Sequence, residues 1–363
     1  MQGVYCTQCG KPYPASGTPF QCTCGGIFDF REFPRYSVQD VHKNAPGLWR
    51  YFNLLGLQEP VNPVSLGEGN TALVPISESA EDVFVKLEYQ NPTGSYKDRG
   101  TAVLMTFLKS RNVDYAVEDS SGNAGASFAA YAARAGVMAR VYVPESASGP
   151  KRSQIEAYGA ELVAVPGPRS NAAKAVLEEA SRGTAYASHA FMPMGLTGIA
   201  TIAYEIVEQL GKIPGTIISP VGHGGLLYGI MRGFEAVVKS GFAQQEPFYL
   251  GVQSKACNPV ARAFVTRERI VELPSGETIA EGVKVSNPVR GDAILSHIRR
   301  TQGKMSVIDE DQLLCAYHEL ADLGFFAEPT SALAYAALQQ EINILPKPVV
   351  LILTGAGAKT RIS

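Results

Sequence analysis

Short β-prone runs alternate with helix-prone segments through the middle of the chain, and this alternation constrains the fold more than any other feature. Apolar runs of four or five residues are each followed, after a turn, by an Ala-rich or amphipathic stretch. Strands and helices that alternate at this spacing form a parallel sheet with helices on both faces. An α/β protein is therefore predicted. The expected strands are Tyr115–Glu118, Arg140–Val143 and Glu161–Val165, and the expected helices are Phe128–Gly136, Gln154–Tyr158 and Asn171–Arg182.

Length and charge limit the class of protein further. The chain has 363 residues, enough for two or three domains. A net charge of -2 argues against a nucleic-acid or anionic-membrane surface. We find no run of about 18 uncharged apolar residues, so no membrane span is expected. The first residues, Met1–Cys6, have neither a basic start nor an apolar core, so they are not a signal peptide and a cytoplasmic location is expected.

A candidate catalytic lysine lies where a turn meets a helix. The β-prone run Val83–Leu87 precedes Asn91–Gly100, whose Asn-Pro and Thr-Gly pairs form turns. An apolar helix is expected from Thr101 onward, which puts Lys97 at its first turn. The positive end of a helix and the neighbouring Arg99 disfavour a second positive charge, and an uncharged lysine is a nucleophile. The alternative is a solvated Lys-Asp-Arg cluster at a helix start.

Two further loops have the composition of anion-binding sites. The strand ending at Glu118 runs into Asp119–Ser127, and the strand Thr216–Pro220 runs into Val221–Leu227, before helices expected at Phe128 and Tyr228. Glycines let backbone N–H groups converge on an anion at a helix N-terminus. The second loop is not a dinucleotide fingerprint, because Leu227 occupies the position of the third glycine. Either loop could also be a structural turn, and His223 could be a phosphate donor or an ordinary polar residue.

Four cysteines crowd the first 24 residues. Cys6 and Cys9 form a C-x-x-C pair followed by glycine, and Cys22 and Cys24 form a C-x-C pair. Paired thiolates at such spacings suit a tetrahedral zinc site, which would supply the folding energy of a segment with little core. Thiols without a metal, or a redox role, are the alternatives. The isolated Cys257 and Cys315 are expected to be buried small hydrophobic residues.

Several motifs together resemble one family. Asn91–Gly100 resembles the cofactor-lysine motif of the threonine synthases and their relatives, which are pyridoxal-phosphate enzymes of the tryptophan-synthase-β fold (fold type II). Ser65–Leu73, Ala280–Pro288 and Phe325–Ala332 are similar to further segments of that family, in the same order. The resemblance covers most of the chain. It implies two α/β domains with the cofactor between them: a large domain of residues 34–105 and 195–363, and a small domain of residues 106–194. Residues 1–33 resemble the zinc-ribbon-like N-terminal segment of many such proteins, which implies a structural metal site.

The resemblance also implies roles for individual residues. Lys97 would carry pyridoxal phosphate and act as the general base. The cofactor phosphate would bind to Gly222, His223, Gly224, Gly225 and Leu226, the ring oxygen to Asn123 and the ring nitrogen to Thr354. The substrate carboxylate would bind to Ser120, Ser121 and Asn123, and the zinc to Cys6, Cys9, Cys22 and Cys24.

The chain departs from the family pattern in two places. Ala124 stands where a threonine is usual, and residues 192–200 are apolar where related sequences carry polar groups. Three hypotheses follow. The first is a threonine synthase acting on O-phosphohomoserine. The second is a threonine or serine dehydratase, or a β-replacement enzyme on another activated amino acid, favoured by the apolar segment. The third is a non-catalytic binding protein of the same fold. A homodimer is expected, in which the apolar run from Trp49 to Leu55 is either core or subunit contact.

Overall fold

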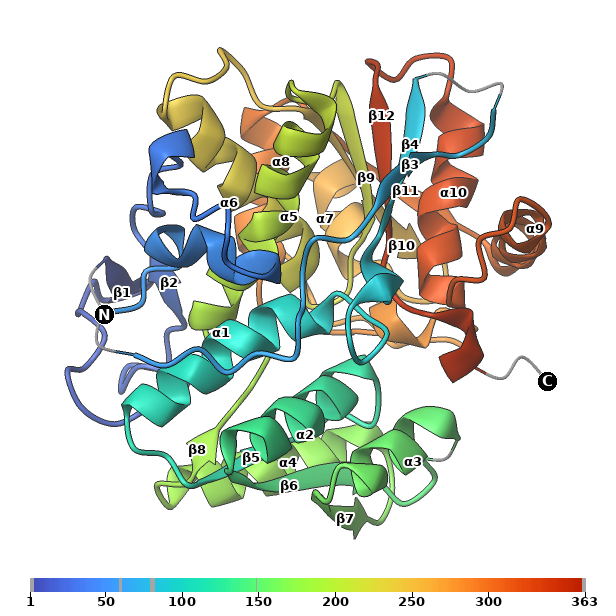
Figure 1. The fold of residues 1–363 in the computed structure, drawn as a ribbon. Coiled ribbons are helices and arrows are strands. Elements are labelled where there is room, and N and C mark those ends of the chain that lie inside the picture. Colours follow the sequence, from blue (N-terminus) through green and yellow to red (C-terminus); the bar gives the residue numbers. More distant parts are fainter. Residues whose placement is uncertain (1–2, 59–60, 79–81, 148, 361–363) are drawn as a thin grey trace. The chain divides into compact units, whose positions relative to one another are not determined.

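The computed structural model describes residues 3–58, 61–78, 82–147 and 149–360 (Figure 1). Contacts within the chain define two compact units. Unit 1 comprises Met1–Gly69 and Asn91–Thr201, and unit 2 comprises Asn70–Gln90 and Ile202–Ser363. Residues 34–69 and 91–105 thus group with unit 1, although the sequence assigned them to a large domain. The division into a ribbon, a large domain and a small domain stays a prediction.

Unit 1 begins with a small antiparallel ribbon. Its strands β1 (Val4–Cys6) and β2 (Phe28–Phe30) pair with Tyr5 opposite Asp29. The ring of Tyr13 packs edge-on against Phe28, 4.8 Å between centroids. The 3-10 helices η1 (Val38–Asp40) and η2 (Gly47–Leu54) follow. Trp49, Tyr51, Leu54 and Leu55 are buried, so this apolar run is core.

The rest of unit 1 is a parallel sheet with its helices. The strand order is β7-β6-β5-β8, and all three pairings are parallel. Helix α1 packs on α2, α2 on α3, and α4 on the strands. The strands are β5 (Tyr115–Glu118), β6 (Met138–Pro144), β7 (Glu161–Val165) and β8 (Ala185–Tyr186), and the helices are α1 (Lys97–Ser110), α2 (Asn123–Ala135), α3 (Pro150–Ala157) and α4 (Arg169–Ser181).

Unit 2 is a six-stranded sheet in the order β11-β10-β9-β12-β4-β3, in which only β3 is antiparallel to its neighbour. Helix α10 contacts β9, β10, β11 and β12, and α9 packs on α10 (both helices are orange-red to red in Figure 1). The predicted α/β class with parallel sheets is confirmed. The strands are β3 (Leu73–Pro75), β4 (Val83–Leu87), β9 (Thr216–Pro220), β10 (Phe248–Ser254), β11 (Lys304–Ile308) and β12 (Val349–Leu353). The helices are α6 (Gly225–Lys239), α7 (Pro259–Thr266), α8 (Gly291–Arg300), α9 (Glu310–Asp322) and α10 (Pro329–Glu341), with 3-10 turns η3 (Glu88–Gln90), η4 (Glu281–Val283) and η5 (Gly357–Lys359). Helix α5 (Met194–Leu210) contributes residues to both units.

Two helices begin earlier than the sequence analysis expects. Helix α2 begins at Asn123 and α6 at Gly225, whereas the expected first residues are Phe128 and Tyr228. Glycine, serine and asparagine have low helix propensity, but the first turn of a helix has unpaired N–H groups that such residues leave accessible. Each loop singled out in the sequence therefore passes directly into a helix N-terminus.

Two other findings concern the whole described chain. In the described ranges, none of the helices has the length and apolar character needed to cross a lipid bilayer. Cys257 is buried as predicted, but the prediction for Cys315 was wrong. Cys315 is exposed on α9, where its thiol donates a hydrogen bond of 3.3 Å to Glu319 one helical turn later.

A fully buried ion pair fixes the interior of unit 2. Lys86 Nζ lies 2.7 Å from Glu205 Oε2, and both side chains are completely shielded from solvent. Lys86 also donates to the carbonyl of Thr71 at 2.7 Å, and Glu205 Oε1 accepts the N–H of Asn70 at 2.7 Å. The pair thereby joins α5 to β4 and to the chain entering β3.

Replacing Glu205 with alanine should destabilise unit 2 by about 3–5 kcal/mol, because Lys86 is left as an uncompensated buried charge. The measurement is the denaturation midpoint in urea. The matched control is Glu178→Ala, which breaks an exposed ion pair with Arg182 and should cost less than about 1 kcal/mol. Equal losses in the two variants would contradict this account of the pair.

Candidate active site

Lys97 is the first residue of α1, and a buried carboxylate fixes the turn that presents it. Asp98 accepts the backbone N–H of Thr93 at 2.7 Å and its hydroxyl at 2.6 Å. It also accepts the hydroxyl of Ser127 from α2 at 2.7 Å, and its side chain is fully buried. Lys97 itself is half-buried, with Nζ 4.8 Å from the centre of the Tyr96 ring. The predicted position of this lysine, at the turn where a helix begins, is confirmed.

The apolar segment 192–200 packs against the first turn of α1. A Cβ on Gly198 would lie 2.0 Å from the carbonyl oxygen of Arg99, and a Cβ on Gly100 would lie 3.1 Å from the carbonyl oxygen of Gly195. Such proximity is possible only between glycines or other small residues. The larger apolar side chains of the segment are buried: Met192, Met194, Leu196 and Ile199. Close packing of the glycines on α1 and burial of the larger side chains thus give a structural reason for the apolar composition.

The loop after β5 is folded tightly at the N-terminus of α2. The hydroxyl of Ser120 accepts the N–H of Gly122 at 3.2 Å. A Cβ on Gly125 would lie 1.8 Å from the carbonyl oxygen of Ser120, so only glycine fits at that position. Ser120 is buried, and Ser121 and Asn123 are half-buried at the helix start. The three predicted substrate residues therefore lie in one loop of unit 1.

A buried acid beneath this loop escaped the sequence analysis. Glu118 accepts the backbone N–H of Ser120, and its other oxygen lies 2.7 Å from Nδ1 of His189. Burial raises the pKa of Glu118 to about 7, against the opposing effects of the Ser120 N–H and of the positive charges of Lys97 and Arg169. Lys97 is therefore within electrostatic reach of the loop's supporting acid. A charged residue ending an apolar strand was the only sequence signal for Glu118.

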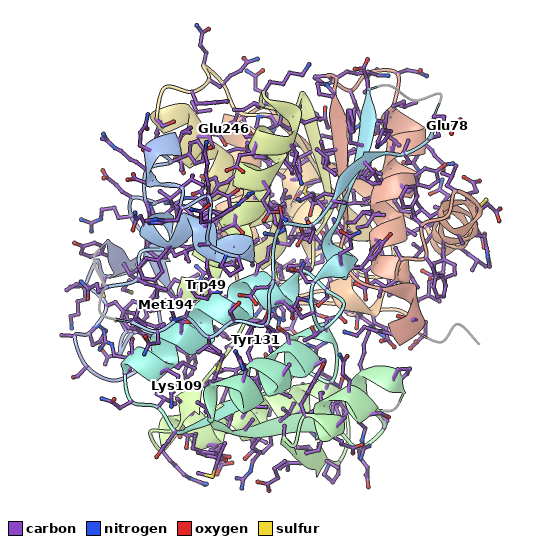
Figure 2. All side chains as sticks on the ribbon, viewed as in Figure 1. Trp49, Glu78, Lys109, Tyr131, Met194 and Glu246 are labelled. Carbon is purple, nitrogen blue, oxygen red and sulfur yellow. The ribbon has the colours of Figure 1, made fainter. Side chains whose placement is uncertain are left out.

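A second acid, the half-buried Asp119, lies beside Glu118. Asp119 Oδ1 accepts the hydroxyl of Tyr186 at 2.6 Å, and desolvation raises the pKa of this carboxyl group. A third, Glu68, lies in the glycine-rich segment that precedes β3. It accepts the indole N–H of Trp49 and the hydroxyl of Tyr131, both at 2.6 Å (Trp49 and Tyr131 are labelled in Figure 2). Glu68 is fully buried and anchors its segment to η2 and α2.

In unit 2, the loop Gly222–Leu226 has the form of an anion cradle. Gly224 has a φ of +95°, and a Cβ there would lie 2.6 Å from Ile294 and 3.0 Å from Arg290. At Gly222 a Cβ would lie 2.6 Å from the carbonyl oxygen of Gly282. The first N–H groups of α6 receive no side-chain cap from Gly224, so they can bind a phosphate. No observation tests the role of the His223 side chain, which stays a prediction.

Thr354 lies at the same edge of the sheet as this loop. It directly follows β12, and β12 is the parallel neighbour of β9, which leads into the loop. The Thr354 hydroxyl donates to Glu328 Oε1 at 2.8 Å and is 3.0 Å from the hydroxyl of Ser331. Glu328 and Ser331 were not predicted as site residues. A phosphate cradle and a buried hydroxyl at one sheet edge fit a phosphorylated ring compound such as pyridoxal phosphate.

The four N-terminal cysteines converge as predicted. Their sulfur atoms all lie within 4.8 Å of one another, with Cys6 and Cys22 buried and Cys9 and Cys24 exposed. The backbone N–H of Cys9 lowers the pKa of the Cys6 thiol to about 6, and that of Cys24 lowers the pKa of Cys22. The backbone N–H of Lys11 also lowers the pKa of Cys9. The neighbouring sulfur atoms and burial have the larger, opposite effect and raise the pKa of Cys9 to about 11. Thiolates this close repel one another unless a cation lies between them.

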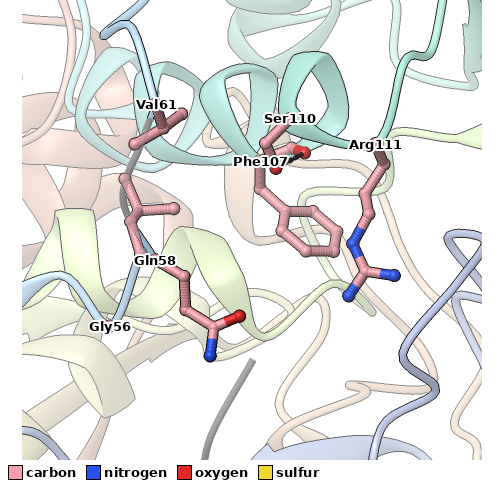
Figure 3. Close-up of a pocket in the computed structure, with 7 residues that line it drawn as sticks. Gly56, Gln58, Val61, Phe107, Ser110 and Arg111 are labelled. Atoms are coloured by element: carbon pink, nitrogen blue, oxygen red, sulfur yellow. Dashed lines mark hydrogen bonds between the residues drawn. The ribbon is translucent and has the colours of Figure 1, made fainter.

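A surface cavity of unit 1 lies at the opposite end of α1 from Lys97 (Figure 3). Helix α1 rises about 1.5 Å per residue, so its last residue, Ser110, lies about 20 Å along the helix axis from Lys97. The cavity is lined by Gly56, Leu57, Gln58, Val61, Phe107, Ser110 and Arg111.

Comparisons with known proteins agree on one family. Residues 64–355 match the family model described as pyridoxal-phosphate dependent enzyme. The chain is 34% identical to the threonine synthase of Methanocaldococcus jannaschii, over 98% of this chain and 92% of the relative. It is 30% identical to the threonine synthase of Methanosarcina acetivorans, over 98% of this chain and 91% of the relative. A solved threonine deaminase from T.th. has a TM-score of 0.65 at 28% identity, covering 77% of this chain and 88% of that one.

A Gly224→Ala substitution should disturb the cradle, because its Cβ would collide with Ile294 and Arg290. We expect pyridoxal phosphate to bind at least about tenfold more weakly, as measured by equilibrium dialysis. Gly241→Ala is the matched control, since Gly241 also has a positive φ of 83° but nothing within 4 Å of an added Cβ. If both variants retain the cofactor equally, this loop is not its phosphate site.

Proposed function

The chain belongs to the family of pyridoxal-phosphate dependent enzymes, and from that premise we propose that it is a threonine synthase, which converts O-phospho-L-homoserine into L-threonine and phosphate. The observation that carries the proposal is the similarity to threonine synthases over 98% of the chain. The match to the family model covers residues 64–355, which include parts of both units.

Each predicted site residue has a role in this proposal. Lys97 would hold the cofactor covalently, and Thr354 and Asn123 would bind its ring nitrogen and ring oxygen. Bound pyridoxal phosphate supplies an electron sink for negative charge at the substrate Cα. The loop from Gly222 to Leu226, including His223, Gly224 and Gly225, would bind the cofactor phosphate through backbone N–H groups. Ser120, Ser121 and Asn123 would bind the substrate carboxylate.

Lys97 would also move the proton at Cα. A primary amine at a rigid helix start, beside a loop that orients the substrate, is suited to general base catalysis. The hydrogen bonds of Asp98 to Thr93 and Ser127 support this role, because they hold the backbone at Lys97 in one conformation.

The apolar segment 192–200 no longer favours a dehydratase over a threonine synthase. Its glycines pack on α1 and its larger apolar side chains are buried, which is a structural reason for the apolar composition that holds for either reaction. The similarity to a threonine deaminase structure keeps a dehydratase as the second candidate. The activity assay below separates the two reactions by their products.

Purified protein with pyridoxal phosphate should release phosphate from O-phospho-L-homoserine and form an equal amount of L-threonine. Lys97→Ala should reduce this rate more than about a thousandfold, because the cofactor attachment and the base are both removed. Lys109→Ala, in the last turn of the same helix, is the control and should keep the rate. Formation of a 2-oxo acid from L-threonine or L-serine, without phosphate release, would establish the dehydratase instead.

We also propose that Cys6, Cys9, Cys22 and Cys24 bind a structural zinc ion. The convergence of four sulfur atoms supports this, and a divalent cation would neutralise the repulsion among the thiolates. We propose further that the chain forms a homodimer, for which light scattering would give a mass of twice 38.8 kDa. The proposed location of the protein is the cytoplasm.

Elemental analysis should find about one zinc per chain. Cys22→Ser should lose the zinc and unfold at lower temperature, whereas Cys315→Ser should retain it, since Cys315 lies on α9, outside the cluster. A metal-free protein whose thermal midpoint is unaffected by Cys22→Ser would rule out the metal site.

A further inference from the structure

The acid beneath the Ser120 loop joins two segments that lie far apart in the sequence. Glu118 is the last residue of β5 and only 1% exposed, and His189 lies between β8 and α5. One carboxylate oxygen of Glu118 accepts the Ser120 N–H, and the other is 2.7 Å from Nδ1 of His189. Since an ionised carboxylate only accepts hydrogen bonds, Nδ1 of His189 then carries the hydrogen.

These contacts determine which group of Ser120 faces a ligand. The backbone N–H of Ser120 is directed to Glu118, and the Ser120 oxygen accepts the N–H of Gly122 at 3.2 Å. The hydroxyl hydrogen of Ser120 is therefore the group left to donate to an anion. Its direction depends on the position of the Glu118 carboxylate.

The charge of Glu118 acts on the same loop. The charged groups facing Glu118 are Lys97 from α1, Arg169 from α4, the adjacent Asp119, and His189. Burial lowers the pKa of His189 well below its usual value, so this histidine is neutral near pH 7. Burial raises the pKa of Glu118 to about 7, so the charge of the pair changes in the physiological range. An ionised Glu118 would repel a carboxylate bound above it.

We propose that Glu118, held by His189, is a positioning residue that controls how tightly the Ser120–Asn123 loop binds the carboxylate of the amino-acid substrate. The inference rests on the proposed function, because the loop is there assigned to the substrate carboxylate. It adds that the loop's affinity for a carboxylate is highest when Glu118 is protonated. Affinity should therefore fall as the pH rises through neutrality.

The test compares two ligands that differ only by a carboxylate. L-2-Aminobutyrate carries the carboxylate, and propylamine is the same molecule without it. Each is titrated into the holoenzyme from about pH 6 to about pH 8.5, and binding is followed by the change in the cofactor's visible absorbance. At about pH 8.5 the wild-type protein should bind L-2-aminobutyrate about tenfold more weakly than the Glu118→Gln variant does. For propylamine the two proteins should follow the same pH dependence.

Glu118→Gln is suited to the test because glutamine keeps an oxygen to accept the Ser120 N–H but never becomes charged. His189→Ala removes a donor that stabilises the ionised carboxylate, so the transition should move to higher pH. Glu179→Gln is the matched control. Glu179 is a largely buried glutamate of unit 1 that accepts a hydrogen bond from Tyr115, and its variant should behave like wild type.

The possible outcomes separate this inference from the proposed function. If the holoenzyme responds to both ligands but Glu118→Gln and wild type share one pH profile for L-2-aminobutyrate, the role of Glu118 is refuted while the cofactor assignment stands. If neither ligand changes the absorbance, the assignment of Lys97 as cofactor lysine is refuted first. If Glu118→Gln binds L-2-aminobutyrate more weakly than wild type by the same factor at every pH, Glu118 has a structural role only and the inference is refuted.

Discussion

Asp98 accepts three hydrogen bonds from within unit 1, and the turn that presents Lys97 depends on them. The same arrangement recurs at each loop of interest. Glu118 supports the Ser120 loop, Glu328 the hydroxyl of Thr354, and Glu68 the glycine-rich segment before β3. Loops that are buried have N–H and hydroxyl groups that water cannot reach, and each unsatisfied group costs about 1–3 kcal/mol. A carboxylate has room for about four hydrogen bonds, so one acid can satisfy a whole loop.

The alternation of strands and helices was sufficient to predict the fold class, and the glycine and serine patterns located the loops. A β-prone run followed by a Gly-rich turn is a local feature, and the loops after Glu118 and Pro220 were located from it. The resemblance to the pyridoxal-phosphate enzymes is likewise confirmed by the family match. The supporting acids could not be predicted, because their partners are distant in the sequence. His189 lies 71 residues from Glu118, and Tyr131 lies 63 residues from Glu68. Periodicity contains no information about such pairs.

Segment 192–200 shows a limit of composition. Its apolar residues favoured a dehydratase as an alternative, since a binding site for phosphate needs polar donors. In the structure Gly195 and Gly198 bring the backbone of α5 against the first turn of α1, Ile199 lies beside Gly100, and the two methionines are buried. Composition alone cannot distinguish a pocket wall from a helix contact, because both are apolar. The spacing of the two glycines was the available signal for close helix packing.

The N-terminal ribbon also contacts the far end of the helix that begins with Lys97. Arg111, at the C-terminal end of α1, donates hydrogen bonds to the carbonyl oxygens of Pro14 and Ala15, and Tyr13 packs against Phe107. Folding of the ribbon and ordering of α1 are therefore thermodynamically linked. A ligand that stabilised the ribbon would also favour the ordered helix, and by reciprocity a ligand bound at the start of the helix would strengthen binding at the ribbon. The concentration of the ligand that binds one end of α1 would therefore change the fraction of chains that bind the ligand at the other end.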